Sequence, residues 1–178
     1  MSVKIVKSDK LKFLSAMEGG YKLYSFVPSA RRLFPKSGAM RKMDARQRLR
    51  FLLLLTSGYR VYVLTNDADD AVGCAVFANG KARRFSFADK NDLVCGPYFI
   101  QPEYRNRGLA AKMLGFVIEN YETEYRSIFA HIWHTNIASI KCMAKLGFER
   151  VDALRTTKYL QKFVSDPNGK IVLVEKKR

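Results

Sequence analysis

The segment Arg105-Asn106-Arg107-Gly108-Leu109-Ala110 places two arginines and a glycine directly before an apolar pattern with helical spacing. The first turn of a helix carries backbone amides without helical acceptors, at the positive end of the helix dipole. A glycine there lets an anion approach the backbone closely, so the segment could bind a pyrophosphate. It lacks the G-x-x-x-x-G-K-[ST] and G-x-G-x-x-G patterns, which disfavours triphosphate and dinucleotide sites. The alternative is an ordinary strand-to-helix turn in which glycine relieves crowding.

A second segment, NIASIKCMAKLGFER, opens with Asn136 and closes on Lys-Leu-Gly-Phe at residues 145–148. The two segments together resemble the GNAT superfamily of acyl-CoA-dependent N-acetyltransferases. The first matches the acyl-CoA signature R/Q-x-x-G-x-G/A of that family, and the second resembles its later helix motif. Two motifs in the right order, with a strand pattern between them, are more specific than either alone. The resemblance covers residues 92–149.

The resemblance implies that acetyl-CoA is the cosubstrate and indicates which residues hold it. The strand with Phe99 and Ile100 would separate from the strand at 128–132 and bind the pantetheine arm through its backbone. Amides of residues 107–111 and the two arginine side chains would hold the pyrophosphate, and the later helix would add two polar side chains. The alternatives are a plain N-cap for Asn136 and a solvated position for Ser139. The expected cofactor-binding residues are Phe99, Ile100, Arg105, Arg107, Gly108, Leu109, Ala110, Ala111, Asn136 and Ser139.

The sequence departs from the family at the residue that supplies a proton. Many members have a tyrosine two positions before the lysine of Lys-Leu-Gly-Phe, where it protonates the departing CoA thiolate. Here that residue is Met143, whose thioether cannot donate a proton and whose helical spacing from Ile140 suits a core position. The acid is then Cys142, Tyr98 or a water molecule, or the thiolate leaves unprotonated.

The general base is equally open, because an attacking amine must first lose its proton. Asp92 lies on the same strand face as Val94, the position that matches the glutamate of members that use one. His134 follows the next strand and is the second candidate. The simpler roles are a turn residue for Asp92 and a loop cap for His134. We expect no metal site, since His131 and His134 have no third ligand at a suitable spacing.

The order of hydrophobic patterns predicts one mixed α/β domain over residues 1–178, with a mostly antiparallel central sheet and flanking helices. An Asn79-Gly80 turn predicts a hairpin, and Pro167-Asn168-Gly169 predicts a turn between two final strands within 158–177. The predicted strands are 3–6, 57–67, 71–78, 81–87, 92–100 and 127–133. The predicted helices are one capped by Asp9 that runs through Leu11 and Leu14, then 41–55, 107–121 and 136–146.

Positive charge is concentrated away from the expected cofactor site. The net charge is +16, and the first 60 residues hold 14 basic and 3 acidic side chains, or +11. In the family that the chain resembles, N-terminal helices cover the acceptor side, so we expect an acceptor with negative charge near its amine. The alternatives are a basic surface that only aids solubility and a nucleic-acid-binding module, although zinc and RRM patterns are absent. The arginines expected to meet the acceptor are Arg31, Arg32, Arg46, Arg48 and Arg50.

The remaining features suggest a cytoplasmic enzyme. Three widely spaced cysteines suit reduced thiols, and neither a signal-peptide pattern nor an apolar run longer than five residues occurs. We therefore expect no membrane partner. The expected function is acetyl transfer from acetyl-CoA to a primary amine of a small molecule or protein. The alternative within the family is an acyl-CoA-binding relative with weakened catalysis. Acceptor identity, acyl chain length and oligomeric state stay open.

Overall fold

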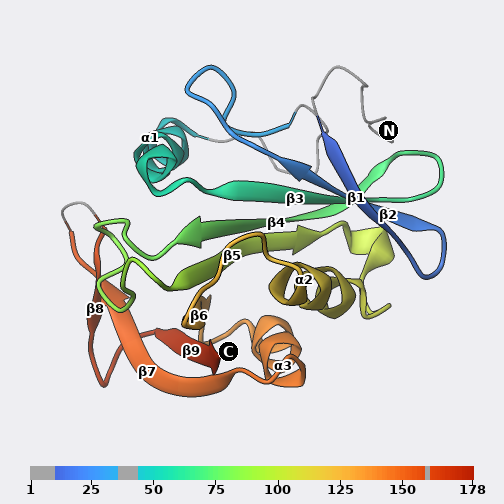
Figure 1. The fold of residues 1–178 in the computed structure, drawn as a ribbon. Helices are drawn as coiled ribbons and strands as arrows, with labels where there is room; N and C mark the ends of the chain where they lie inside the picture. The colour runs from blue at the N-terminus through green and yellow to red at the C-terminus, as the bar shows by residue number, and fades with distance from the viewer. Residues whose placement is uncertain (1–10, 36–43, 159–160) are drawn as a thin grey trace.

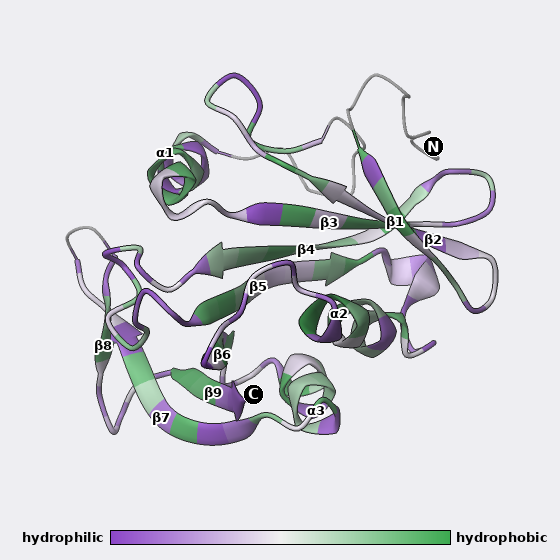
Figure 2. Ribbon diagram, viewed as in Figure 1, coloured by the Kyte–Doolittle hydropathy of each residue, from purple (hydrophilic) through white to green (hydrophobic). Residues whose placement is uncertain are grey.

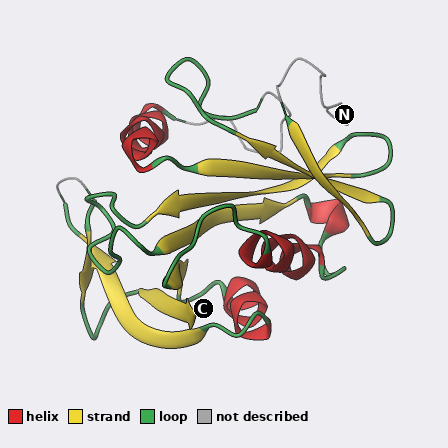
Figure 3. Cartoon of the chain, viewed as in Figure 1, coloured by secondary structure: helices red, strands yellow, loops and turns green. Residues whose placement is uncertain are grey.

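The structure is a computed structural model that describes residues 11–35, 44–158 and 161–178. Three α-helices and a nine-stranded sheet make up these residues, which confirms the predicted mixed α/β class (Figure 3). None of the described helices is long and apolar enough to cross a bilayer. The elements are β1 (Lys12–Met17), β2 (Tyr21–Phe26), α1 (Ala45–Leu54), β3 (Arg60–Thr65), β4 (Ala71–Asn79), β5 (Leu93–Ile100), α2 (Leu109–Glu119), β6 (Ser127–Trp133), α3 (Ile137–Lys145), β7 (Glu149–Thr156), β8 (Phe163–Ser165) and β9 (Ile171–Lys177).

The sheet has the strand order β1-β2-β3-β4-β5-β6-β9-β7-β8. Its described pairs are antiparallel except β5 and β6, which are parallel because α2 carries the chain back across the sheet between them. This parallel ladder is short, with Leu93, Val94 and Cys95 opposite residues 128–130. Beyond Cys95 the two strands are no longer paired, so the second half of β5 has one edge available.

Alternating side chains give the sheet two apolar faces with separate cores. In β3, Val61 and Val63 join one core, whereas Tyr62 and Leu64 join the other. Helices α2 and α3 cover the Tyr62 face, and α1 packs on the Val61 face (Figure 1). Hydrophobic residues of α2 accordingly lie on its sheet-facing side (Figure 2). The paired half of β5 and β6 is thus fixed between two cores.

The N-terminal prediction was wrong where the structure describes it. Leu14 lies in strand β1, which pairs with β2, rather than in a helix capped by Asp9. Strand β2, at Tyr21–Phe26, was not predicted; it pairs with β3 and completes that edge of the sheet. The strand predicted at residues 3–6 and the Asp9 cap lie outside the described residues. Strand β2 depends on pairing with β3, which is distant in sequence, and the spacing of nearby hydrophobic residues does not indicate such pairing.

The predicted Asn79-Gly80 hairpin was also wrong, and the two predicted final strands do not pair with each other. Asn79 pairs with Leu93 of β5, and the residues between them form turns rather than a strand at 81–87. The Asn79 side chain accepts a hydrogen bond from the Lys81 amide, which closes a local turn. At the C-terminus, β8 and β9 both exist but each pairs with β7, an unpredicted strand at Glu149–Thr156. Phe85 of the loop at 80–92 and Phe163 of β8 belong to the same core as Phe51 and Leu54 of α1.

Candidate active site

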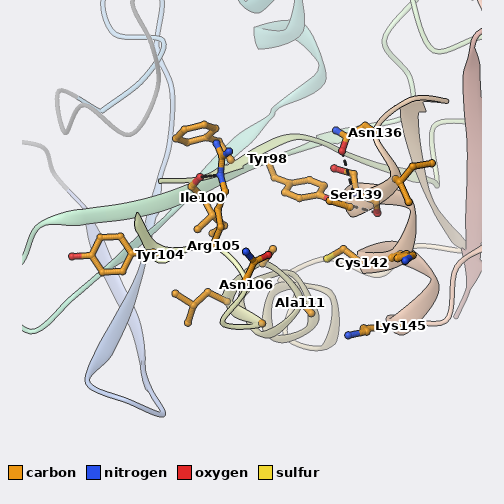
Figure 4. A pocket seen from close by; sticks show the side chains of 17 residues that line it. Tyr98, Ile100, Tyr104, Arg105, Asn106, Ala111, Asn136, Ser139, Cys142 and Lys145 are labelled. Carbon is orange, nitrogen blue, oxygen red and sulfur yellow. Dashed lines mark hydrogen bonds between the residues drawn. The ribbon is translucent and has the colours of Figure 1, made fainter. Parts of the chain in front are cut away.

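A cavity of about 690 Å³ opens beside the unpaired half of β5. Its walls are the end of β5, the turn that leads into α2, the first turn of α2, and one face of α3 (Figure 4). All expected cofactor-binding residues except Arg107 line it, together with Cys142 and Tyr98. The lining residues that the sequence did not indicate are Tyr104, Asn106, Ile137, Ala138, Lys141 and Lys145. Those on α3 recur at helical spacing with Cys142, a signal that could have identified them.

The N-terminus of α2 forms one end of the cavity. Gly108 is the N-cap residue of α2, with a left-handed φ of 71°, and no side chain caps the helix amides there. Asn106 also has a left-handed φ, of 61°. The Lys112 amide donates to the Gly108 carbonyl and is the first amide with a helical acceptor, so the amides of residues 109–111 have no acceptor within the helix. A Cβ at Gly108 would meet nothing within 4 Å, so this approach is open. Three amides at a positive helix end, beside a residue with no side chain, fit a pyrophosphate.

The two arginines of the signature differ in position. Arg105 lines the cavity; its Nε donates to the Ile100 carbonyl at 3.0 Å, and its guanidinium lies 5.3 Å from the Phe99 ring centroid. Arg107 instead donates to the Glu103 carbonyl at 3.0 Å, and its guanidinium lies 5.4 Å from the Tyr104 ring centroid. Only Arg105 therefore presents its side chain to the cavity as the structure stands.

The first turn of α3 forms the opposite wall. Asn136 caps this helix, because its side-chain carbonyl accepts the Ser139 amide at 3.2 Å. Both residues also line the cavity, so the capping role and a ligand contact are compatible. Lys141 and Lys145 lie one turn apart on the cavity side, and both are exposed. They add positive charge to this wall of the cavity.

Tyr98 and Cys142 approach each other inside the cavity. The Tyr98 hydroxyl donates to the Ser139 carbonyl at 3.5 Å and also interacts with the Cys142 thiol (Figure 4). Burial raises the pKa of Tyr98 above its usual range, and burial also raises the pKa of the Cys142 thiol. Both groups are therefore protonated near neutral pH. Met143, by contrast, is fully buried in the core and does not line the cavity.

The two expected bases lie elsewhere. Asp92 precedes β5, at the opposite end of that strand from Ile100, and is 1% exposed. Its carboxylate accepts from the Asp89 amide at 2.8 Å and from Arg126 at 3.0 and 3.1 Å, so its oxygens are already used. His134 is exposed just after β6 and is not part of the cavity lining. The described residues include no group of three or more His, Cys, Asp or Glu that could hold a metal ion.

Comparisons with known proteins agree with this geometry. The profile of the Acetyltransferase (GNAT) family matches residues 23–148. No curated protein matches the sequence. The fold is similar to that of a ribosomal-protein-S5-alanine acetyltransferase from Vibrio fischeri, with a TM-score of 0.62, 16% identity, and 92% of this chain and 96% of that chain covered.

Two further solved structures share the fold. One is a GNAT family acetyltransferase from Elizabethkingia anophelis with acetyl-CoA bound, with a TM-score of 0.64, 13% identity, and coverage of 90% of this chain and 100% of that chain. The other is an aminoglycoside acetyltransferase in complex with coenzyme A and kanamycin, with a TM-score of 0.55, 19% identity, and 70% of each chain covered. The family profile spans both sequence motifs, the separated strands and the cavity between them, and the chain therefore belongs to the acetyltransferase (GNAT) family.

Proposed function

We propose that this protein transfers an acetyl group from acetyl-CoA to a primary amine. The observation that carries the proposal is the cavity beside β5, with uncapped α2 amides at one end and the Tyr98–Cys142 pair inside. Anion-binding amides and buried proton donors in a single cavity suit a thioester that carries a pyrophosphate. Bound acetyl-CoA would supply the activated acyl group, and the protein would orient it.

In this proposal the cofactor phosphates bind at the start of α2. Amides of residues 107–111 hold the pyrophosphate, and Arg105 adds a charged side chain from the same wall. Arg107 would have to leave the Glu103 carbonyl to contribute. Lys141 and Lys145 can neutralise further phosphate charge from α3. The unpaired edge of β5, near Phe99 and Ile100, would bond the pantetheine amides as a neighbouring strand does.

Tyr98 is the proposed proton donor to the departing thiolate, with Cys142 as the alternative. Family members place a tyrosine on the later helix for this step, and here Met143 occupies that position in the core. Tyr98 supplies a hydroxyl to the same cavity from β5 instead. The raised pKa of Tyr98 keeps the hydroxyl protonated under working conditions.

Removal of the amine proton falls to His134 or to water in this proposal. The described residues that line the cavity include neither a carboxylate nor an imidazole, and the paired Asp92 is poorly placed. His134 is exposed two residues before Asn136, close in sequence to the cavity wall. Replacement of His134 by glutamine should therefore lower kcat and leave CoA affinity unchanged if His134 is the base, whereas an unchanged kcat would assign proton removal to water.

We further propose that the acceptor carries negative charge. The support is the charge of the N-terminal third and the position of its arginines. Arg46 and Arg48 are exposed on α1, Arg31 is exposed, Arg32 lines a separate hollow with Arg60, and Arg50 is half-buried. Such a surface attracts anions over distances comparable to the Debye length, and salt weakens the attraction.

The test is a panel of amines incubated with acetyl-CoA, with thiol release followed by a colorimetric reagent and the products examined by mass spectrometry. The panel pairs anionic amines, such as phosphorylated amines and amino acids, with polyamines. We expect amine-dependent thiol release and an N-acetylated product. CoA binding without turnover on any amine would instead indicate a relative that has lost catalysis. Preference for a cationic polyamine would contradict the anionic acceptor.

A further inference from the structure

A cluster of aromatic rings lies on the sheet face opposite the cofactor cavity. Phe85 and Phe87 come from the loop at 80–92, His131 from β6, and Phe163 from β8. The His131 ring centroid is 4.4 Å from that of Phe163, 6.0 Å from that of Phe85 and 6.2 Å from that of Phe87. The Phe163 amide donates to the Arg84 carbonyl at 3.0 Å, which ties β8 to the loop. Three segments distant in sequence therefore build one aromatic cluster, in which Phe85 and Phe163 are buried.

Arg84 enters this cluster without a counter-ion among the described residues. Its guanidinium carbon lies 5.0 Å from the Phe163 ring centroid and 5.5 Å from that of Phe85. Its Nε is enclosed and has no hydrogen-bond partner, and no side-chain hydrogen bond or ion pair joins Arg84 to another described residue. Burial and the charge of Arg50 on α1 lower the pKa of Arg84 to about 10, so it stays charged at neutral pH.

The cluster stands where the two central strands separate. Ala130 is the last β6 residue paired with β5, opposite Cys95, and His131 is the next residue along β6. Phe129 and His131 point to the α1 side of the sheet, whereas Ala130 belongs to the core on the α2 side. An amine that reaches a thioester held between the separated strands from the α1 side would pass this cluster.

His131 contributes polarity without charge. Its Nδ1 is enclosed and lacks a partner among the described residues. Burial and the nearby Arg84 lower the pKa of His131 to about 3, so the imidazole is neutral at pH 7. A base this weak does not take a proton from an ammonium ion, but a neutral imidazole can donate or accept a hydrogen bond. It therefore suits ligand recognition better than proton removal.

A partly buried cation with no partner is unfavourable unless something else compensates it. Every acidic residue except Asp9 lies within the described part of the chain, and none of those described is in ion-pair contact with Arg84. Aromatic faces offset only part of the loss of hydration. An anionic group on a ligand would satisfy the guanidinium and gain strength from the apolar surroundings.

We propose that Arg84, with His131 beside it, binds a carboxylate or phosphate group of the amine acceptor. The inference rests on the proposed transfer function and assigns the acceptor's anion to a contact on the far side of the strand opening. The Arg84 contact would be a direct one, whereas the exposed arginines of α1 would attract the acceptor at long range. Arg50 supplies a second positive charge near the same point.

Matched acceptors test the contact directly. We would measure kcat/KM for O-phosphoethanolamine against ethanolamine and for β-alanine against β-alaninamide, with wild type, Arg84→Met and Arg83→Met. Arg83 is exposed and adjacent to Arg84 in sequence, so Arg83→Met is a control that removes the same charge. We expect at least a tenfold preference for one anionic member, lost in Arg84→Met and kept in Arg83→Met. Equal rates within both pairs in wild type, or a preference that survives Arg84→Met, would overturn the proposal while leaving amine acetylation intact.

A binding measurement decides the question if none of these amines is a substrate. Thermal unfolding would be followed with inorganic phosphate or glutarate, at ionic strength matched with chloride. Phosphate also meets the α2 amides in every variant, so the difference between variants is the readout. We expect Arg84→Met to fold with equal or higher melting temperature and to lose part of the anion-induced shift, while Arg83→Met behaves as wild type. Identical shifts in all three proteins would contradict an anion site at Arg84.

Discussion

Tyr98 and Cys142 present two proton donors to one cavity from different elements. Tyr98 belongs to β5 and Cys142 to α3, and the two interact beside the Ser139 carbonyl. The sequence named both as alternatives, because the family tyrosine is replaced by Met143. It could not rank them, since the ranking depends on how β5 and α3 place the two side chains in the folded chain.

Tyr98→Phe should lower kcat by roughly 100-fold, the order expected for loss of a general acid. Cys142→Ser should change kcat little. Because burial raises the pKa of both groups, the acid form persists beyond pH 9 and kcat should stay level on the basic side. The check is a kcat–pH profile at saturating substrates. A basic limb near the ordinary thiol pKa that disappears in Cys142→Ser would assign the role to the thiol instead.

Met143→Leu should leave turnover nearly unchanged. Met143 is fully buried among core residues, and leucine conserves its volume, so the free energy of unfolding should fall by less than about 1.5 kcal/mol. Steady-state kinetics and chemical denaturation of the same preparation check this. A large loss of kcat at unchanged stability would show that Met143 acts in catalysis.

The buried carboxylate of Asp92 fixes the start of strand β5. Asp92 accepts the Asp89 amide and two nitrogens of Arg126, which precedes β6. The pairing joins the loop at 80–92 to the first residues of both parallel strands. Asp92 therefore fixes the end of the ladder opposite to the one that opens, which is a structural task rather than a catalytic one.

Asp92→Ala should destabilise the fold and leave kcat of the folded enzyme unchanged. The change leaves the Asp89 amide and Arg126 without a buried acceptor, at a cost of roughly 2 kcal/mol in the free energy of unfolding. Asp89→Ala is the matched control, because Asp89 meets the same arginine from an exposed position and should matter little. Denaturation curves and kinetics below the melting point separate the two effects. Loss of kcat at full stability would restore Asp92 as the base.

Elements with strong local signals were predictable, and elements that depend on distant partners were not. Gly108 and Asn136 mark the beginnings of α2 and α3 through backbone conformation and capping, which depend on a few neighbouring residues. Strands β2 and β7 depend on pairing with β3 and β9, and the Asn79 turn leads into a long loop because β4 pairs directly with β5. Most of the residues that line the cavity beside β5 were therefore predictable. The Arg84 cluster was not, because β8 and the loop at 80–92 meet only in the folded chain.

At the scale of the whole molecule, the exposed arginines of α1 and the cavity beside β5 lie on opposite faces of the sheet. The lining of this cavity begins at Tyr98, whereas the first 60 residues of the sequence carry a net charge of +11. Strand β5 belongs to the sheet that separates α1 from the cavity, because α2 and α3 cover one face of this sheet and α1 covers the other (Figure 1). Acceptor and cofactor would then approach the strand opening from opposite faces, each met by its own set of positive charges.

The double variant Arg46→Glu, Arg48→Glu should raise the KM for an anionic acceptor by roughly fivefold at low salt, because both side chains are exposed on α1 and act by steering. The Kd for CoA should change little. High salt should remove most of the difference, since it screens exposed charges. Initial rates at two ionic strengths, with CoA binding measured in parallel, provide the check. Unchanged KM values at low salt would show that this surface serves solubility.

The measurement that tests the central claim most directly is calorimetric titration of acetyl-CoA into wild type, Gly108→Val and Gly58→Val. Gly108 and Gly58 are both left-handed, with φ of 71° and 65°, and a Cβ at either position meets nothing within 4 Å, so the backbone cost of valine is matched. Only Gly108 lines the cofactor cavity. The account predicts that wild type and Gly58→Val bind acetyl-CoA alike and that Gly108→Val binds at least tenfold more weakly. No binding by folded wild type, or equal binding by all three proteins, would contradict it.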